Sequence, residues 1–154
     1  MKNLHATDFM EPDPVFAGPD MPLSELVPLF WAERVRALPV VEHGRLVGVV
    51  SETDLFLKEK GVPFSLETVT TLLGEPVAGD RLAGLERCDK VTVREVMTDH
   101  PVTITPETTL EDAAMLMHER SLSVLPVVEG DMLVGMARRI NLLRAIYRTQ
   151  SVAA

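Results

Sequence analysis

The chain has 154 residues, of which 46% are hydrophobic and 25% are charged, and its formal net charge is −8 at pH 7. This composition is typical of a globular protein, and no run approaches the ~20 apolar residues that span a bilayer. The acidic balance argues against a nucleic-acid binder, because a polyphosphate backbone would repel the chain. With one cysteine, Cys88, and an N-terminus unlike a secretory signal, we expect a cytoplasmic protein without a membrane partner.

An internal repeat organises these residues. Placing the sequence on itself at an offset of 87 aligns residues 5–55 with 92–142 without a gap, and about 15 of 51 pairs are identical. Each copy has roughly 60 residues and would be marginal alone, so the copies are expected to bury each other's apolar faces. We predict a first repeat over 1–60, a connector with one short helix over 61–91, and a second repeat over 92–154.

The first part of each repeat predicts a short extended piece followed by a helix. The extended pieces are residues 15–17 and 102–104. Apolar residues then follow helical spacing over 23–30 and over 110–117. Thr109 and Asp112 resemble a capping box for the second of these helices, and Phe30 and Trp31 are interpreted as core or dimer contacts.

The second part of each repeat predicts a hairpin and a closing helix. The runs LPVVE and LVGVV, or LPVVE and LVGMA, are apolar on consecutive residues and are separated by turns of hairpin length. A helix starts near Glu52 and another near Arg139. The predicted fold class is therefore α/β (α+β), with the order β-α-β-β-α in each repeat.

The stretch VGVVSETDL contains the first candidate ligand-binding residues. A buried strand that opens directly into a helix places the Ser51 hydroxyl, the first helical N–H groups and the Asp54 carboxylate together. Such a helix start attracts anions, and a carboxylate there can accept two hydrogen bonds from a vicinal diol. The same residues also form a plain capping box, with Ser51 as N-cap and Asp54 at the third helical position. Both interpretations stay open on this stretch alone.

With these residues in view, the chain resembles a tandem pair of CBS domains, the cystathionine-β-synthase module also called a Bateman module. The resemblance rests on two gapless units of the type LPVV…LVGVVSETDL, each preceded by a lead-in similar to VMTxxPVTI. It implies two β-α-β-β-α repeats related by a pseudo-twofold axis and a homodimer joined through helical faces. It also implies that AMP, ADP, ATP or S-adenosylmethionine binds in a cleft between the copies.

The same resemblance assigns roles to single residues. The family's ribose-binding pattern, Ser or Thr followed three residues later by Asp, falls on Ser51 and Asp54. Val49 would line the adenine, and Arg36 would face the phosphates, although an exposed Arg at this place is often only solvated. The other copy would contribute part of the cleft through four residues: Val102, Leu122, Ser123 and Val124.

The second copy departs from the ribose-binding pattern. Arg138 stands at the Ser position and Asn141 at the Asp position. A charge-assisted hydrogen bond contributes roughly 1.5–3 kcal/mol and a neutral one about 1 kcal/mol. Asn141 would therefore bind a ribose hydroxyl more weakly than Asp54 would. This site is therefore expected to be weaker, repurposed or empty. Arg138 and Arg139 either reach phosphates or belong to an ordinary basic set on the final helix.

No catalytic or metal-binding pattern is evident. The four histidines lack metal-ligating spacing, and Cys88 has no nearby sequence partner. We therefore predict a non-enzymatic regulatory module that senses an adenine nucleotide or S-adenosylmethionine and signals to a regulated protein partner. The alternative is a ligand-free interaction module that docks a partner protein through its helical faces.

Overall fold

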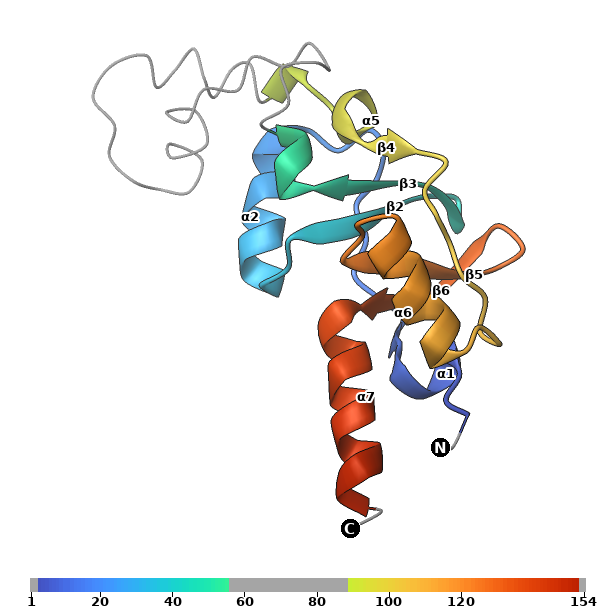
Figure 1. Cartoon of the computed structure of the whole chain (residues 1–154). Coiled ribbons are helices and arrows are strands. Elements are labelled where there is room, and N and C mark those ends of the chain that lie inside the picture. Colours follow the sequence, from blue (N-terminus) through green and yellow to red (C-terminus); the bar gives the residue numbers. More distant parts are fainter. Residues whose placement is uncertain (1–2, 56–88, 153–154) are drawn as a thin grey trace. The chain divides into compact units, whose positions relative to one another are not determined.

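A computed structural model describes residues 3–55 and 89–152 (Figure 1). The predicted connector helix and Cys88 lie outside these residues. The described chain forms two compact units, and each unit combines parts of both repeats. Unit 1 comprises residues 3–14, 44–46 and 101–152, whereas unit 2 comprises residues 15–43, 47–55 and 89–100.

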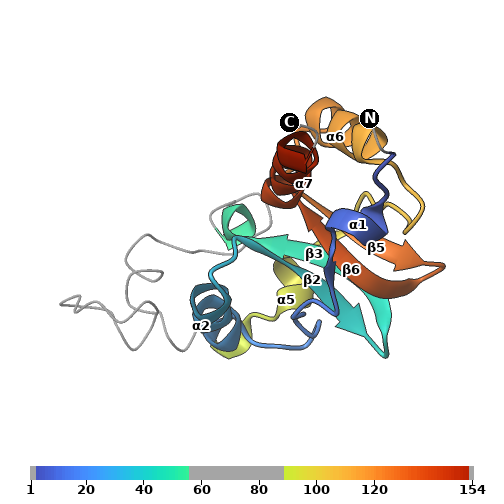
Figure 2. The same cartoon turned by 90° about the horizontal axis from the view of Figure 1, so that it is seen from below.

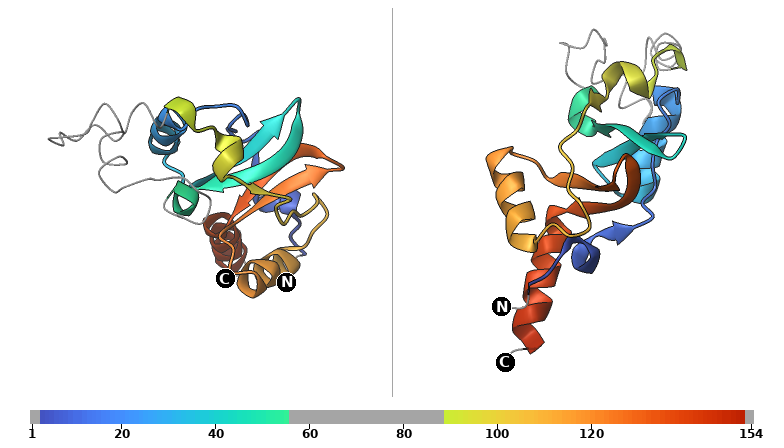
Figure 3. Two further views of the ribbon diagram at one scale, coloured as in Figure 1. Left: turned by 90° about the horizontal axis from the view of Figure 1, so that it is seen from above. Right: turned by 90° about the vertical axis from the view of Figure 1, so that its right-hand side faces the viewer.

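Unit 2 contains the helix and hairpin of the first repeat together with the lead-in of the second. Its elements are α2 (Leu23–Glu33), β2 (Ala37–Glu42), β3 (Arg45–Ser51, of which 47–51 lie in this unit), the 3₁₀ helix η1 (Glu52–Leu55), α5 (Val93–Val96) and β4 (Thr98–Asp99). β2 neighbours β3, and β4 pairs with β3 in antiparallel orientation. Figure 3 shows α5, in yellow, beside the cyan strands of this hairpin.

Unit 1 has the same arrangement, but here the helix and hairpin come from the second repeat and the lead-in comes from the first. Its elements are α1 (Ala6–Phe9), β1 (Glu11–Pro12), α6 (Leu110–Glu119), β5 (Val124–Glu129), β6 (Met132–Arg138) and α7 (Arg139–Val152). β6 pairs antiparallel with both β5 and β1. Helices α1, α6 and α7 contact one another, and Figure 2 shows α6 beside α7.

The short helices α1 and α5, which lie in the lead-ins of the two repeats, complete the two cores. Val93 and Val96 of α5 are fully buried among the apolar residues of α2, β2 and β3, and Ala6 and Phe9 of α1 are buried among those of α6, β5 and β6. Burying one such valine stabilises the fold by roughly 1.5–3 kcal/mol. Each four-residue helix is therefore part of a core built mainly by the other repeat.

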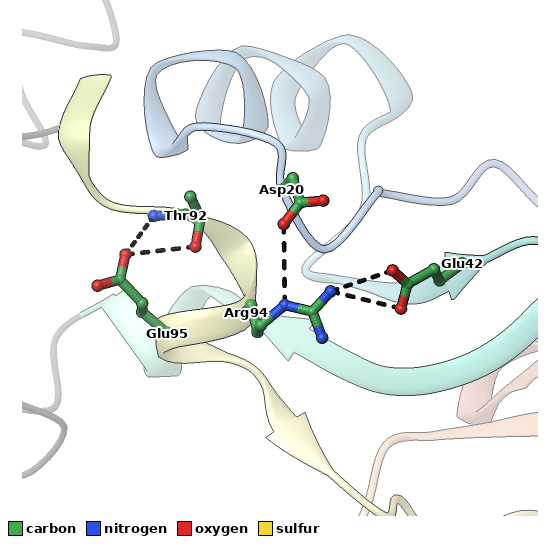
Figure 4. Close-up of polar contacts among 5 residues, drawn as sticks. All are labelled: Asp20, Glu42, Thr92, Arg94 and Glu95. Atoms are coloured by element: carbon green, nitrogen blue, oxygen red, sulfur yellow. Dashed lines mark hydrogen bonds and ion pairs between the residues drawn. The ribbon is translucent and has the colours of Figure 1, made fainter.

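Backbone hydrogen bonds hold the lead-ins in this exchanged position. In unit 2, the Leu23 amide donates to the Val91 carbonyl at 3.0 Å. In unit 1, the Leu110 amide donates to the Leu4 carbonyl at 2.8 Å. A capping contact starts α5, where the Thr92 amide donates to the Glu95 carboxylate at 2.7 Å (Figure 4). The same geometry thus recurs at an offset of 87.

The structure confirms the mixed α/β fold class and corrects several details. The extended pieces predicted at 15–17 and 102–104 are reduced to single parallel bridges, Ala17 to Val40 and Ile104 to Val127. The short elements α1, β1, α5 and β4 were not predicted, because two to four residues are too few to show a helical or strand period. The expected cap of α6 is confirmed, since the Asp112 amide donates to the Thr109 hydroxyl at 3.1 Å.

The second strand of each hairpin is less buried than predicted. β2 and β5 are buried along nearly their whole length, whereas β3 and β6 become buried only toward their C-terminal ends. Phe30 belongs to the core of unit 2, whereas Trp31 is 64% exposed, so of its two interpretations, core or dimer contact, only the dimer contact stays a prediction. Within residues 3–55 and 89–152, no helix is both long and apolar enough to cross a bilayer.

Candidate functional site

The end of β3 holds a buried carboxylate. Ser51 is the last residue of this strand, and Asp54 follows in η1, where only 6% of its surface is exposed. One carboxylate oxygen of Asp54, Oδ2, accepts hydrogen bonds from the Ser51 amide at 2.8 Å and from the Ser51 hydroxyl at 3.1 Å. The capping contact expected from the sequence is therefore present. It also fixes a negative charge at the strand end.

Arg36 lies close to this strand end. Its backbone carbonyl accepts a hydrogen bond from the Glu52 amide at 2.9 Å, and this contact joins the residue before β2 to the start of η1. Arg36 itself is exposed. The structure thus brings a cationic residue, Ser51 and the buried carboxylate of Asp54 together within unit 2.

Val49 lies two residues before the end of β3 and is partly buried. It pairs with Thr98 of β4, a residue that sequence reasoning did not include. The repeated lead-in pattern was the available signal, but it does not show which hairpin the lead-in joins. Gly48 permits this close crossing, since a Cβ there would lie 2.8 Å from the Thr98 carbonyl oxygen.

The corresponding position in unit 1 keeps the backbone geometry and changes the side chains. The Ser123 carbonyl accepts from the Arg139 amide at 3.0 Å, as the Arg36 carbonyl does from Glu52. The Asn141 Oδ1 accepts from the Arg138 amide at 2.8 Å, which matches the bond between Ser51 and Asp54.

Two of these unit 1 side chains contact Glu11 of β1. The Arg138 side chain is only 14% exposed, and its Nε lies 3.5 Å from Glu11 Oε2. Asn141 is 9% exposed, and its Nδ2 lies 3.5 Å from Glu11 Oε1. Arg138 is therefore engaged within unit 1. It is the last residue of β6 and precedes α7, so the interpretation of Arg138 as part of a basic set on the final helix is wrong.

The other unit 1 residues of the candidate set differ in exposure. Val102 and Leu122 are partly buried and pack against the unit 1 core, Ser123 is exposed, and Val124 pairs with Arg138 at the start of β5. Their contribution to a ligand site stays a prediction. Within the part of the chain that the structure describes, no three His, Cys, Asp or Glu side chains are grouped to hold a metal ion.

The comparisons with known proteins agree with this architecture. The model of the CBS domain matches twice, over residues 6–60 and 93–148. The CBS domain-containing protein YhcV of Bacillus subtilis is 30% identical over 83% of this chain and 75% of its own length. The protein MJ1426 of Methanocaldococcus jannaschii is 28% identical over 86% of each chain.

A solved structure extends the likeness to the fold. CBSX2 is a protein of Arabidopsis thaliana, and its crystal structure in complex with AMP is similar to this one. The two sequences are 28% identical, and the match covers 96% of this chain and 98% of that chain. Its TM-score against this structure is 0.73. The two family matches cover most of the chain, and the helix and hairpin of each match recur at an offset of 87. The chain therefore belongs to the CBS domain family and contains two CBS domains.

Proposed function

We propose that this chain is a regulatory module that binds an adenine nucleotide at the end of β3 in unit 2. The observation that carries the proposal is the buried Asp54 carboxylate beside the Ser51 hydroxyl. The similarity to CBSX2, which was crystallised with AMP, supports the choice of an adenine nucleotide as ligand. S-adenosylmethionine shares the adenosine part and stays a candidate.

Asp54 and Ser51 are suited to a ribose. A carboxylate accepts strong hydrogen bonds from hydroxyl groups, and such charge-assisted bonds contribute roughly 1.5–3 kcal/mol each. Burial of a carboxylate is costly unless its hydrogen bonds are satisfied, and the Ser51 amide satisfies part of this demand. The carboxylate is therefore held in one orientation before the ligand arrives, which lowers the entropy cost of binding.

Arg36 and Val49 supply the remaining contacts in this proposal. The guanidinium of Arg36 is exposed and pairs well with phosphate oxygens in a two-pronged geometry. The partly buried side chain of Val49 offers an apolar surface for the adenine ring. A nucleotide that prefers one of two conformations of the chain would shift their populations, and that shift would be the regulatory signal.

Calorimetric titration of the full chain with AMP, ADP, ATP and S-adenosylmethionine tests the proposal. We expect at least one of these ligands to bind, and we expect Asp54→Ala to weaken that binding. Glu52→Ala is the matched control, because Glu52 is an exposed acid in the same short helix. The proposal fails if none of the four ligands binds or if both variants bind as tightly as the unaltered chain.

An exposed apolar face on α7 supports a role in association. Ile140, Leu143 and Tyr147 are 47%, 56% and 73% exposed, and their spacing of three and four residues places them along one face of the helix. Exposed apolar side chains in a row often mark a protein contact. We propose that this face joins two copies of the chain into a homodimer. Docking of a different protein on the same face, without any ligand, is the second candidate function.

A further inference from the structure

The two strand ends are equivalent in backbone but not in side chains. At an offset of 87, Ser51 corresponds to Arg138 and Asp54 to Asn141. The lead-in strands correspond as well: Thr98 of β4 pairs with Val49 of β3, and Glu11 of β1 pairs with Met136 of β6.

Of the side chains that differ between the two positions, three contact one another in unit 1: Glu11, Arg138 and Asn141 stand where unit 2 has Thr98, Ser51 and Asp54. The Glu11 carboxylate contacts the Arg138 guanidinium through Oε2 and the Asn141 amide through Oε1, each at 3.5 Å. The Asn141 oxygen accepts from the Arg138 amide, so both ends of the Asn141 side chain have partners within unit 1. In unit 2, Asp54 stands where the neutral amide of Asn141 stands in unit 1.

This network opposes a nucleotide in two ways. A ribose would have to displace Glu11, which is 46% exposed, from Arg138, which is 14% exposed, and removing one partner of a largely buried guanidinium is unfavourable, although solvent at Glu11 reduces the cost. In addition, Glu11 would place a carboxylate close to the incoming phosphates, and like charges at short range repel. The unit 1 strand end is thus occupied by a side chain of the protein itself.

We infer that Glu11 closes the unit 1 strand end to ribose through Arg138 and Asn141, so that each chain binds one nucleotide, in unit 2. This inference rests on the proposed function and adds the stoichiometry and the residue that sets it. It assigns to Glu11 a role in specificity, since the carboxylate excludes a ligand from one of two related positions.

Calorimetry with AMP, and with ATP if AMP gives no heat, measures the number of sites. We expect one site per chain for the unaltered protein. In Asp54→Ala, we expect the affinity of that site to fall at least tenfold. Two sites of comparable affinity, or one site unaffected by Asp54→Ala and abolished by Asn141→Ala, would overturn the inference. Absence of binding by every adenosine ligand contradicts the proposed function instead, so the two failures are distinguishable.

A gain-of-site variant tests the role of Glu11 directly. The triple variant Glu11→Thr, Arg138→Ser, Asn141→Asp copies the side chains of Thr98, Ser51 and Asp54 into unit 1. We expect a second site in this variant, weaker than the first because Ser123 stands where unit 2 has Arg36, whereas Glu107→Thr, which alters an exposed acid elsewhere in unit 1, keeps one site. A folded triple variant with one site contradicts the inference. If circular dichroism shows that the triple variant is unfolded, the stoichiometry of the unaltered chain and of Asp54→Ala decides the question.

Discussion

Arg94 of α5 forms an ion pair with Glu42 at the end of β2, with 3.2 Å between Nη2 and Oε1 (Figure 4). The two residues are 52 positions apart and come from different repeats, yet both belong to unit 2. Asp20 lies 3.8 Å from the same guanidinium. This ion pair adds an electrostatic contact to the apolar packing that holds α5 against the hairpin of the first repeat.

The ion pair should contribute little to stability, because the two side chains are 47% and 36% exposed. A double-mutant cycle with Arg94→Ala and Glu42→Ala is expected to give a coupling of about 0.5 kcal/mol in urea unfolding, decreasing at high salt. Thr7 and Glu129 are the equivalent residues in unit 1, and because Thr7 carries no charge, their cycle should give no coupling. A zero value for Arg94 and Glu42 would contradict the expectation.

Substitution of Asp54 should separate its structural role from its binding role. Asn141 makes the same backbone bond in unit 1 that Asp54 makes in unit 2, both at 2.8 Å. Asp54→Asn should therefore keep the capping contact and the free energy of unfolding, while nucleotide affinity falls about tenfold, or roughly 1.4 kcal/mol.

Asp54→Ala should lower both quantities. We expect a loss of about 1 kcal/mol in the free energy of unfolding and a 10- to 100-fold loss of affinity, measured by urea unfolding and calorimetry. If both variants lose stability but bind with unchanged affinity, Asp54 is only a capping residue.

Gly48 should not tolerate a side chain. A Cβ at this position would lie 2.8 Å from the Thr98 carbonyl oxygen, which cannot move without disturbing the pairing of β3 with β4. Gly48→Ala is therefore expected to cost about 1–3 kcal/mol in thermal or urea unfolding. Gly18→Ala is the matched control, because nothing lies within 4 Å of its Cβ, and it should cause no loss. Equal stabilities of the two variants would show that the crossing of β4 is not tight.

We expect the exposed apolar face of α7 to determine whether the protein is a dimer or a monomer in solution. Leu143→Asp places a charge in the middle of this face, so we expect the mass measured by light scattering after gel filtration to fall from that of a dimer to that of a monomer. Phe16→Ser removes a 53% exposed aromatic residue that is not on a helix, and it should leave the mass unchanged. A monomeric unaltered chain would refute association through α7.

Several features of the site followed from local sequence. The pairing of Ser51 with Asp54 could be predicted, because residues three positions apart at a helix start are neighbours whatever the rest of the chain does. The helices α2 and α6 could be predicted because their apolar residues recur at helical spacing, and the hairpins because consecutive apolar residues flank polar turns. The contacts of Glu11 with Arg138 could not, since 127 positions separate the two residues.

The sequence by itself determined the repeat, the order of the main elements and the residues at each strand end, because these depend on periodicity and on contacts within a few positions. Only the tertiary structure decided that each lead-in helix completes a core formed mainly by the other repeat, and that Glu11 occupies the strand end in unit 1. Four-residue helices have no readable period, and their position is set by apolar burial and hydrogen bonds with distant residues. The same backbone therefore presents a carboxylate at one strand end and an internal ion pair at the other.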